Sequence, residues 1–514
     1  MFENQYLLLY NFNIMISKVL SALPIGYDGA IIEVEGDMNK GLPAFNIVGM
    51  GSKTISESRD RVRSAIVNSM FSFPNKKVTI NLAPAELHKD GAYLDLPIAL
   101  ATLILSNQLL QSDVKDKLFV GELSLDGALR PIRGIINIVE VAKKARTPTI
   151  FVPIENFSQA SLVSGIEIIG VSSLKELFLH LKNEQKIINS EITMPTSTAN
   201  SNSTLLDHIR GQKQAKRALQ IAIAGRHNIL INGPPGAGKT LLAKAATNLL
   251  PKPSSSEQVA ITKIHSLGGI SDDIVTERPF RAPHHTASTV SIIGGGANAQ
   301  PGEISLAHHG VLFLDELPEY PRSILESLRQ PLEDKKITVS RANAKTSYPA
   351  DFMLIATMNP CPCGFLGSPD HECTCTPQQI HNYSKKLSGP LLDRIDILID
   401  VAKVDNSDLL KTTTPTSIEH NTVRQSIERA ILVQHARFNK NNFYNSNLTS
   451  HQVSKMLHLT NDALALLAQA SDKLSLSARA YFKIIKVAQT IADLDSSVEI
   501  TPVHLSEALQ YRRK

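Results

Sequence analysis

Long hydrophobic runs and cysteines are both scarce in this 514-residue chain. No apolar run approaches the roughly 20 residues that a membrane-spanning helix requires, so we expect no membrane partner. Residues 1–16 are apolar, but they contain Glu3 and lack a positively charged start, which argues against a secretory signal peptide. Only four cysteines are present. Without a secretory signal, this cysteine content predicts a cytoplasmic protein in a reducing compartment.

The composition that remains is that of a soluble globular protein, with 42% hydrophobic and 20% charged residues. A chain of this length should hold two to four domains, each large enough for its own core. The net charge of +5 and the isoelectric point near 8.8 are a mild basic excess. Such an excess permits a polyanionic partner without requiring one.

The most specific motif lies near the middle of the chain and fits the pattern G-x-x-x-x-G-K-[ST]. An apolar run at 228–231 precedes it and a run with helical character at 241–246 follows it, which is the strand–loop–helix context of a P-loop. In that arrangement backbone N–H groups and the helix N-terminus surround the phosphates, the lysine pairs with the β/γ oxygens, and the threonine binds Mg²⁺. The motif therefore predicts ATP binding; the alternative is an ordinary glycine turn before a helix. Its residues are Gly233, Pro234, Pro235, Gly236, Ala237, Gly238, Lys239 and Thr240.

Two later apolar stretches end in polar residues that suit the same chemistry. Residues 310–314 lead into Asp315 and Glu316, and residues 355–358 lead into Asn359. Ligands of parallel sheets lie at the carboxyl ends of the strands. We therefore expect Asp315 to hold Mg²⁺ through water and Glu316 to orient or deprotonate the attacking water. A buried strand followed by an acidic turn is the alternative interpretation of Asp315 and Glu316.

Several positions around these motifs resemble those of AAA+ ATPases. The segment 209–212, which includes Gly211, resembles the adenine-side segment of that class. By the same resemblance, Asn359 takes the sensor-1 position and contacts the γ-phosphate or the lytic water, and Arg479 matches the sensor-2 arginine.

Arg394 follows a Gly-Pro-Leu-Leu-Asp sequence and resembles an arginine finger. Such an arginine reaches the ATP of the neighbouring subunit and stabilises charge in the transition state. This resemblance implies a homo-oligomer. A surface ion pair with Asp393 or Asp396 is the alternative role of Arg394.

The predicted fold class is α/β: a P-loop core with a parallel sheet and flanking helices, a C-terminal all-α lid, and an N-terminal α+β domain. In the first part of the chain, segments with the alternating pattern of strands take turns with segments that have the amphipathic pattern of helices. After residue 422 the apolar residues follow helical spacing. A stretch rich in Ser, Thr and Asn between them is typical of a flexible linker. The expected divisions are 1–14 (an N-terminal extension), 15–182 (N-terminal domain), 183–206 (linker), 207–404 (ATPase core) and 405–514 (helical lid).

Residues 89–95, 121–127 and 131–134 resemble the proteolytic domain of Lon, a Ser/Lys protease. Tyr93 occupies the position of the serine nucleophile and Ile136 that of the lysine. Neither side chain can perform the chemistry. The resemblance therefore implies a Lon-like fold that acts as a structural or assembly module.

Four long motifs, at 41–49, 81–85, 278–286 and 302–308, resemble the ComM/YifB family. This is a family of magnesium-chelatase-like AAA+ proteins with a Lon-like N-terminal domain. The resemblance implies a hexameric, ATP-driven DNA translocase that promotes branch migration as incoming single-stranded DNA is integrated during natural transformation. The N-terminal extension and the cysteine spacing depart from the family pattern.

Residues 336–341 and 345–348 flank a polar turn and predict a β-hairpin where related motors carry a pore hairpin. Arg341 and Lys345 would lie near its tip and contact DNA; a solvated hairpin with basic residues is the alternative. The loop 293–298 is the expected second pore insert, flexible and uncharged.

All four cysteines fall within 15 residues, as Cys361-x-Cys363 and Cys373-x-Cys375. Four thiolates can close a tetrahedral site for a structural Zn²⁺, although His371 could replace one of them. Reduced free thiols in a loop are the alternative.

Two other motor classes compete with the DNA translocase. A metal-chelatase motor shares the AAA+ core, but the Lon-like domain and the full-length resemblance argue against it. A protein unfoldase would carry an aromatic-apolar-glycine pore loop. Between Thr240 and Gly310 the only Phe, Tyr or Trp is Phe280, and Arg281 follows it, so that pore loop is missing.

Overall fold

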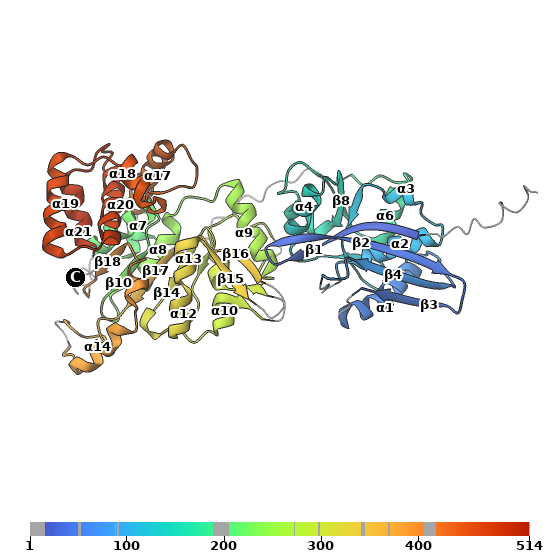
Figure 1. Cartoon of the computed structure of the whole chain (residues 1–514), viewed down its shortest axis with the longest axis horizontal. Coiled ribbons are helices and arrows are strands. Elements are labelled where there is room, and N and C mark those ends of the chain that lie inside the picture. The colour runs from blue at the N-terminus through green and yellow to red at the C-terminus, as the bar shows by residue number, and fades with distance from the viewer. Residues whose placement is uncertain are drawn as a thin grey trace, which may run out of the picture. The chain divides into compact units, whose positions relative to one another are not determined.

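The computed structural model describes residues 16–49, 53–87, 89, 92–188, 205–271, 273–296, 299–340, 345–368, 371–403 and 418–512. The chain divides into two compact units, drawn together in Figure 1. Unit 1 comprises residues 1–196 and 258–275, and unit 2 comprises residues 197–257 and 276–514. Part of the expected linker, 189–204, lies outside the described residues, as does the expected N-terminal extension.

Unit 1 is built on a seven-stranded mixed sheet with the strand order β3-β4-β2-β1-β5-β8-β9. Strand β2 pairs antiparallel with both β4 and β1, whereas β3 pairs parallel with β4 and the strands from β1 through β5 and β8 to β9 are all parallel. The strands are β1 (Ile16–Ile25), β2 (Asp28–Asn39), β3 (Ala44–Val48), β4 (Lys77–Ala83), β5 (Lys117–Phe119), β8 (Thr149–Pro153) and β9 (Glu167–Val171), with a separate ribbon of β6 (Glu122–Leu123) and β7 (Leu129–Arg130).

Both faces of this sheet are covered by apolar side chains. Phe119 and Phe151 stack with ring centroids 4.9 Å apart in one core, while Leu118 and Ile150 on the same strands belong to the other core. Successive side chains of a strand point to opposite faces, which explains these continuous apolar runs. The helices of unit 1 are α1 (Lys53–Asn68), α2 (Asp95–Leu105), α3 (Gln111–Val114), α4 (Ile135–Lys144), α5 (Phe157–Ala160) and α6 (Leu174–Leu181).

One stretch of unit 1 comes from between the motifs of the ATPase core. Helix α9 (Ser255–Leu267) begins in unit 2, and from residue 258 it belongs to unit 1. Within unit 1 the Lys263 ammonium lies 2.6 Å from a carboxylate oxygen of Glu140 on α4, and the Ser266 hydroxyl accepts a hydrogen bond of 3.0 Å from the Gly134 N–H. The chain therefore runs from one unit to the other three times, after residues 196, 257 and 275.

Unit 2 contains a five-stranded sheet with the order β11-β14-β17-β10-β18, in which each neighbouring pair is parallel. The strands are β10 (Ile229–Asn232), β11 (Phe280–Arg281), β14 (Val311–Leu314), β17 (Met353–Met358) and β18 (Ile397–Asp400). Helix α7 (Lys213–Gly225) precedes the first of these strands, and the connections between them contain α8 (Lys239–Leu249), α10 (Thr289–Ile293), α11 (Glu303–Leu306), α12 (Arg322–Ser327), α13 (Arg329–Asp334), α14 (Pro377–Lys385) and α15 (Gly389–Leu392).

Because β17 lies between β10 and β14, the ends of these three strands are neighbours. The α/β class, with a parallel sheet and flanking helices, is confirmed.

The C-terminal helices of unit 2 pack on one another and on α7, as the red part of Figure 1 shows. They are α17 (Ile418–Phe438), α18 (Ser450–Met456), α19 (Asn461–Leu474), α20 (Ala478–Leu494) and α21 (Pro502–Gln510). The hydroxyls of Thr460 and Ser477 accept backbone hydrogen bonds at the starts of α19 and α20, the capping role expected of Thr and Ser. Helix α18 was not expected, because seven residues are too few to display a periodic apolar pattern.

Two small hairpins complete unit 2. Strands β15 (Lys336–Ser340) and β16 (Lys345–Pro349) pair antiparallel, as the sequence predicts, and β12 (Gly294–Gly295) pairs with β13 (Gln300–Pro301). The hairpin tip 341–344 and the loop residues 297–298 lie outside the described part of the chain.

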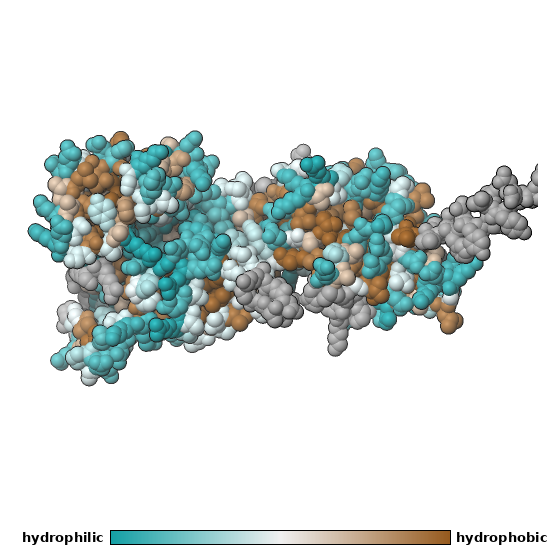
Figure 2. Space-filling model, viewed as in Figure 1, coloured by the Kyte–Doolittle hydropathy of each residue, from teal (hydrophilic) through white to brown (hydrophobic). Residues whose placement is uncertain are grey.

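On the face seen in Figure 2, hydrophobic side chains gather in separate patches between hydrophilic ones. None of the helices in the described ranges combines the length and the apolar character needed to cross a membrane.

Candidate active site

The loop between β10 and α8 has the conformation that its glycines make possible. Gly236 and Gly238 adopt positive φ angles of +77° and +81°, and a Cβ atom at either would meet nothing within 4 Å. These two glycines are therefore required by backbone conformation. At Gly233 the constraint is space, since a Cβ there would lie 2.5 Å from the side chain and carbonyl of Val401. The loop thus turns tightly off the sheet and presents its backbone to open space before α8 begins at Lys239.

The Lys239 ammonium is held at the centre of this loop. It donates hydrogen bonds to the carbonyls of Gly233 and Pro234, the latter at 3.1 Å, and to the Asn359 side-chain oxygen at 2.8 Å. Partial burial lowers the pKa of Lys239, and the carboxylates of Asp315 and Glu316 oppose that shift. The hydrogen bond to Asn359 joins the loop after β10 to the end of the adjacent strand β17.

Asp315 and Glu316 are fixed by one hydroxyl group, that of Thr357. This fully buried residue of β17 donates a hydrogen bond to Asp315 and accepts one of 3.1 Å from the Glu316 N–H. The second Asp315 oxygen accepts a hydrogen bond of 3.3 Å from Thr240 at the start of α8. A carboxylate and a threonine hydroxyl side by side are hard oxygen donors of the kind Mg²⁺ prefers. Thr240 and Asp315 are therefore the pair that fits a magnesium ion.

Glu316 is more exposed than Asp315. Its backbone is in the left-handed region, with φ of +53°, and its side chain is 48% exposed. The Nδ1 atom of His285 lies 4.0 Å from a Glu316 carboxylate oxygen. An exposed carboxylate with a histidine beside it can orient a water molecule at this edge of the sheet or accept a proton from it.

The segment that includes Gly211 also reaches the loop. Gly211 and Gln212 both have positive φ, +59° and +52°. The Gln212 amide donates hydrogen bonds to the Ala237 carbonyl at 3.2 Å and to the Ala402 carbonyl at 2.6 Å. Gln212 therefore ties the P-loop to the chain that leaves β18.

The expected arginine finger, Arg394, and the expected sensor-2 arginine, Arg479, both lie in unit 2. Arg394 pairs with Glu333 of α13 and donates to the Pro390 carbonyl at 2.6 Å, and its side chain is 13% exposed. Its ion-pair partner is thus neither of the aspartates considered from the sequence. Arg479 lies in the first turn of α20 and is exposed.

The structure brings the four cysteines together. Their sulfur atoms all lie within 4.8 Å of one another. Cys361 is 3.3 Å from Cys363 and 3.6 Å from Cys373, measured between sulfur atoms, and Cys363 is also 3.6 Å from Cys373. His371 does not belong to the group; its ring packs on Phe365, with centroids 4.9 Å apart.

Two expected site residues fall on the hairpin tip. Arg341 lies outside the described residues, and so does the side chain of Lys345, whose backbone ends the pairing of β15 with β16. Their role in binding DNA stays a prediction.

In unit 1, the residues expected at the Lon serine and lysine positions lie in or against the apolar cores. Ile136 is fully buried on α4, and the ring of Tyr93 packs against both apolar cores. Burial raises the pKa of the Tyr93 phenol.

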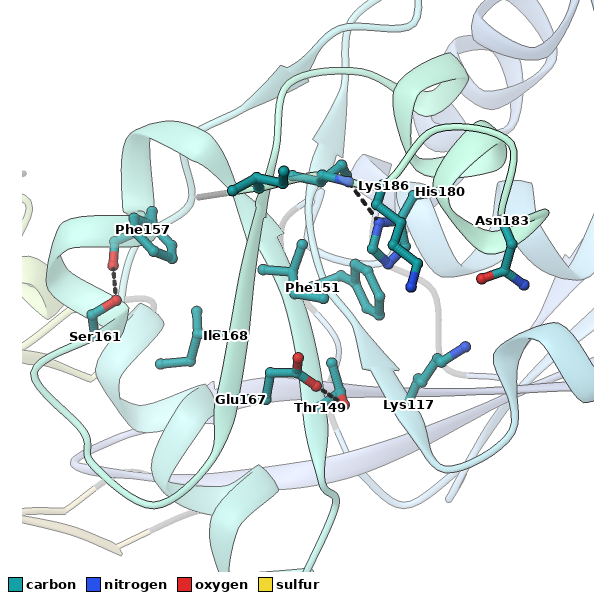
Figure 3. Close-up of a pocket in the computed structure, with 13 residues that line it drawn as sticks. Lys117, Thr149, Phe151, Phe157, Ser161, Glu167, Ile168, His180, Asn183 and Lys186 are labelled. Atoms are coloured by element: carbon teal, nitrogen blue, oxygen red, sulfur yellow. Dashed lines mark hydrogen bonds between the residues drawn. The ribbon is translucent and has the colours of Figure 1, made fainter. Parts of the chain in front are cut away.

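A pocket of about 930 Å³ also lies in unit 1, and Figure 3 shows its lining. Its polar groups are largely paired with their own chain: Glu167 accepts a hydrogen bond of 2.7 Å from Thr149, and His180 accepts one of 3.0 Å from the Ile187 N–H. None of the residues expected at the ATP site lines this pocket, so its volume does not mark the active site.

Three family models match the chain, and all describe magnesium chelatase. "Magnesium chelatase, subunit ChlI" matches residues 205–409, "Subunit ChlI of Mg-chelatase" matches 34–156, and "Magnesium chelatase, subunit ChlI C-terminal" matches 418–512.

Full-length similarity points to a narrower group. The chain is 42% identical over 500 residues to Competence protein ComM of Haemophilus influenzae, an alignment that covers 96% of this chain and 97% of the relative. The chain belongs to the ComM/YifB family. The protein YifB of Escherichia coli is 41% identical over 502 residues and 97% of each chain. The magnesium-chelatase 67 kDa subunit of Chlorobaculum parvum is 26% identical over 156 residues, 30% of this chain and 23% of the relative. ComM/YifB membership, expected from the sequence motifs, is confirmed.

Two of the family motifs quoted from the sequence meet in the structure. Arg281 and Glu303 form a two-pronged ion pair with distances of 2.6 and 2.7 Å. Arg278 makes a second such pair with the buried Glu257, at 3.0 and 2.9 Å. These pairs anchor the segment that carries His285.

Three residues of the site were not individually expected from the sequence: Thr357, His285 and Gln212. Thr357 lies in the same strand as Asn359, two residues before it, so a hydroxyl in a buried strand was the available signal. Gln212 directly follows Gly211, and His285 lies inside a quoted motif.

Proposed function

We propose that this protein is an ATPase motor that moves DNA branches. The observation that carries the ATPase part is the convergence of Lys239, Thr240, Asp315, Glu316 and Asn359 at one edge of a parallel sheet, held by direct hydrogen bonds. Membership of a magnesium-chelatase-like AAA+ family supports the same activity.

The chain's own residues divide the work of hydrolysis. The P-loop backbone and Lys239 bind and orient the triphosphate, and Asn359 contacts its terminal phosphate or the water. Thr240 and Asp315 would hold Mg²⁺, which when bound offsets negative charge on the phosphates. Glu316 orients the attacking water and accepts its proton. Thr357 holds Glu316 and Asp315 in position through its two hydrogen bonds.

The motor is proposed to act as a ring, with six copies expected from the family resemblance. In a single chain Arg394 is neutralised by Glu333, so its role as a finger requires it to exchange that carboxylate for a neighbour's phosphate. Arg479, exposed at the start of α20, is the proposed sensor-2 arginine. A C-terminal helical unit packed on α7 suits a lid over the nucleotide.

The proposed substrate is single-stranded and branched DNA during natural transformation. A relative that matches this chain end to end is named a competence protein. The β15–β16 hairpin lies between Glu316 and Asn359 in the sequence, and Arg341 and Lys345 at its end are the proposed phosphate contacts.

The four cysteines are proposed to bind a structural Zn²⁺. With a Zn–S bond of about 2.3 Å, tetrahedral geometry sets sulfur atoms about 3.8 Å apart. The three separations among Cys361, Cys363 and Cys373 are 3.3 to 3.6 Å, and the Cys375 sulfur lies within 4.8 Å of each of them, so small movements bring all four to that value.

A metal-chelatase motor is the alternative, because all three family models carry that description. The named chelatase subunit, however, matches over only 30% of this chain, whereas the ComM and YifB matches cover 96% and 97%. The end-to-end similarity therefore favours the DNA motor over the chelatase.

The ATPase proposal is tested with two variants. Lys239→Ala should lose productive nucleotide binding, whereas Glu316→Gln should bind ATP and hydrolyse it poorly, because only the water-activating carboxylate is lost. Nucleotide affinity by fluorescence titration and phosphate release measure the two effects separately. Normal turnover by Glu316→Gln would remove Glu316 from the mechanism.

A further inference from the structure

The loop that carries the cysteines touches the P-loop. Gly364, between the two cysteine pairs, has φ of +85°, and a Cβ atom there would lie 2.7 and 2.8 Å from the ring atoms Cδ and Cγ of Pro235. Real Cβ atoms do not approach other heavy atoms so closely, so the Gly364 backbone packs directly against the P-loop proline. A shift of this turn would therefore move Pro235 or leave it without support.

The same loop is connected to the nucleotide site at its other end. Asn359, which receives the hydrogen bond from Lys239, stands two residues before Cys361. Helix α14 follows the last cysteine and contributes the buried Tyr383. Burial raises the pKa of Tyr383 to about 12, and a hydrogen bond from the Asn359 backbone opposes that rise. The cysteine loop thus starts directly after Asn359 and leads into a helix whose Tyr383 contacts the Asn359 backbone.

The sulfur atoms determine the shape of this loop. The described residues between Asn359 and Thr376 form no helix or strand. The Cys363 N–H donates to the Cys375 sulfur at 3.4 Å, and the Leu366 N–H donates to the Cys361 sulfur at 3.3 Å. The Gly364 N–H closes the turn on the Cys361 carbonyl at 3.0 Å. Backbone hydrogen bonds to ligand sulfurs are the outer contacts that orient metal ligands.

We propose that the Zn²⁺ ion held by the four cysteines positions the P-loop for ATP binding. The ion fixes Gly364 against Pro235 and so fixes the conformation of the P-loop. This inference rests on the proposed ATP and Zn²⁺ sites, and it adds a dependence of the first on the second. The metal needs no contact with nucleotide, because Pro235 and Asn359 transmit its effect.

Two glycine substitutions in this loop form a matched test on the full-length protein. Gly364→Ala and Gly367→Ala both place alanine at a positive φ, +85° and +77°, so their backbone strain is similar. They differ in space: a Cβ at 367 meets nothing within 4 Å, whereas one at 364 overlaps Pro235. Gly364→Ala should therefore keep its zinc and weaken the binding of a fluorescent ATP analogue about tenfold or more. Gly367→Ala should match the native protein in both zinc content and affinity.

Removal of the metal gives an independent arm. Cys361→Ser should lose zinc and bind the ATP analogue as weakly as Gly364→Ala. Native protein treated with a chelator should do the same and recover when Zn²⁺ is added back, which covers the case in which Cys361→Ser does not fold. Elemental analysis accompanies every affinity measurement.

The outcomes separate this inference from the proposals beneath it. Native protein without zinc would remove the metal site and this inference together. A native affinity no better than that of Lys239→Ala would overturn the ATP site. The third outcome is that the native protein contains zinc and binds ATP, but Gly364→Ala, Gly367→Ala and the zinc-free protein all have the same affinity for the ATP analogue. That result would refute only the positioning role.

Discussion

Replacement of His308 by Gln should reduce the sensitivity of unit 2 to acid. His308 lies three residues before the start of β14 and is only 7% exposed. Its Nδ1 accepts a hydrogen bond of 3.0 Å from the Asp351 N–H, and its ring lies 3.8 Å from that of His309, between centroids. The pKa of His308 is lowered from 6.5 to about 3, mainly by burial; His309, Arg226 and Lys335 contribute to this shift, and Asp351 opposes it.

The sign of the effect follows from where the proton binds. The unfolded chain takes up a proton at this histidine near pH 6.5, whereas the folded chain does so only near pH 3. The stability contributed by the neutral histidine is therefore complete above pH 6.5 and is lost as the pH falls toward 3. Each pH unit below 6.5 costs about 1.4 kcal/mol of the free energy of unfolding. At pH 5, about 1.5 units below 6.5, the loss is therefore about 2 kcal/mol.

Glutamine at 308 removes this titration but keeps an oxygen that can accept the Asp351 hydrogen bond. Between pH 7.5 and pH 5, the free energy of unfolding should therefore fall by about 2 kcal/mol less in His308→Gln than in the native protein. Urea denaturation followed by circular dichroism at the two pH values gives this difference, and the other titrating groups cancel in it. Parallel losses in the two proteins would refute the claim that His308 is held neutral.

Three further outcomes are expected. Arg394→Ala should keep its affinity for ATP and lose about 10³- to 10⁵-fold in turnover, and mixing it with Glu316→Gln subunits should restore part of the activity; strictly monomeric behaviour without restoration would end the ring proposal. If about six phosphates are neutralised at the hairpin, log K for single-stranded DNA should fall against log salt with a slope of about −4, and Arg341→Ala with Lys345→Ala should flatten it; an unchanged slope would place the DNA contact elsewhere. Unit 1 should show no peptidase activity, since Tyr93 replaces the nucleophile, and casein cleavage by a purified Lys239→Ala variant would contradict this.

The predictable part of the site was the part whose spacing is dictated by chemistry. A P-loop needs its glycines, lysine and threonine at fixed separations, so Lys239 and Thr240 could be read directly from the sequence. Thr357 could not be predicted in this way, because its role depends on β17 lying between β10 and β14. No local sequence pattern specifies the order of strands in a sheet. The same holds for His285, which reaches Glu316 only after the chain has folded through β11.

The division of the chain into units shows the same limit. Composition identified a stretch poor in apolar residues between the two parts, and the expected core began after it. Residues 258–275, however, pack within unit 1 although they lie between the P-loop and Asp315 in the sequence. Their assignment depends on tertiary pairs such as Lys263 with Glu140, whose members are far apart in the chain.

The most direct test of the central claim is the rate of ATP hydrolysis with and without DNA, measured on the full-length protein with single-stranded, duplex and forked DNA. Lys239→Ala gives the background rate. A DNA-driven motor should hydrolyse ATP faster when single-stranded or forked DNA is present, and should move the branch of a forked substrate only while ATP is consumed. An ATPase rate that is well above background yet unchanged by every DNA, with no branch movement, would contradict the proposed function.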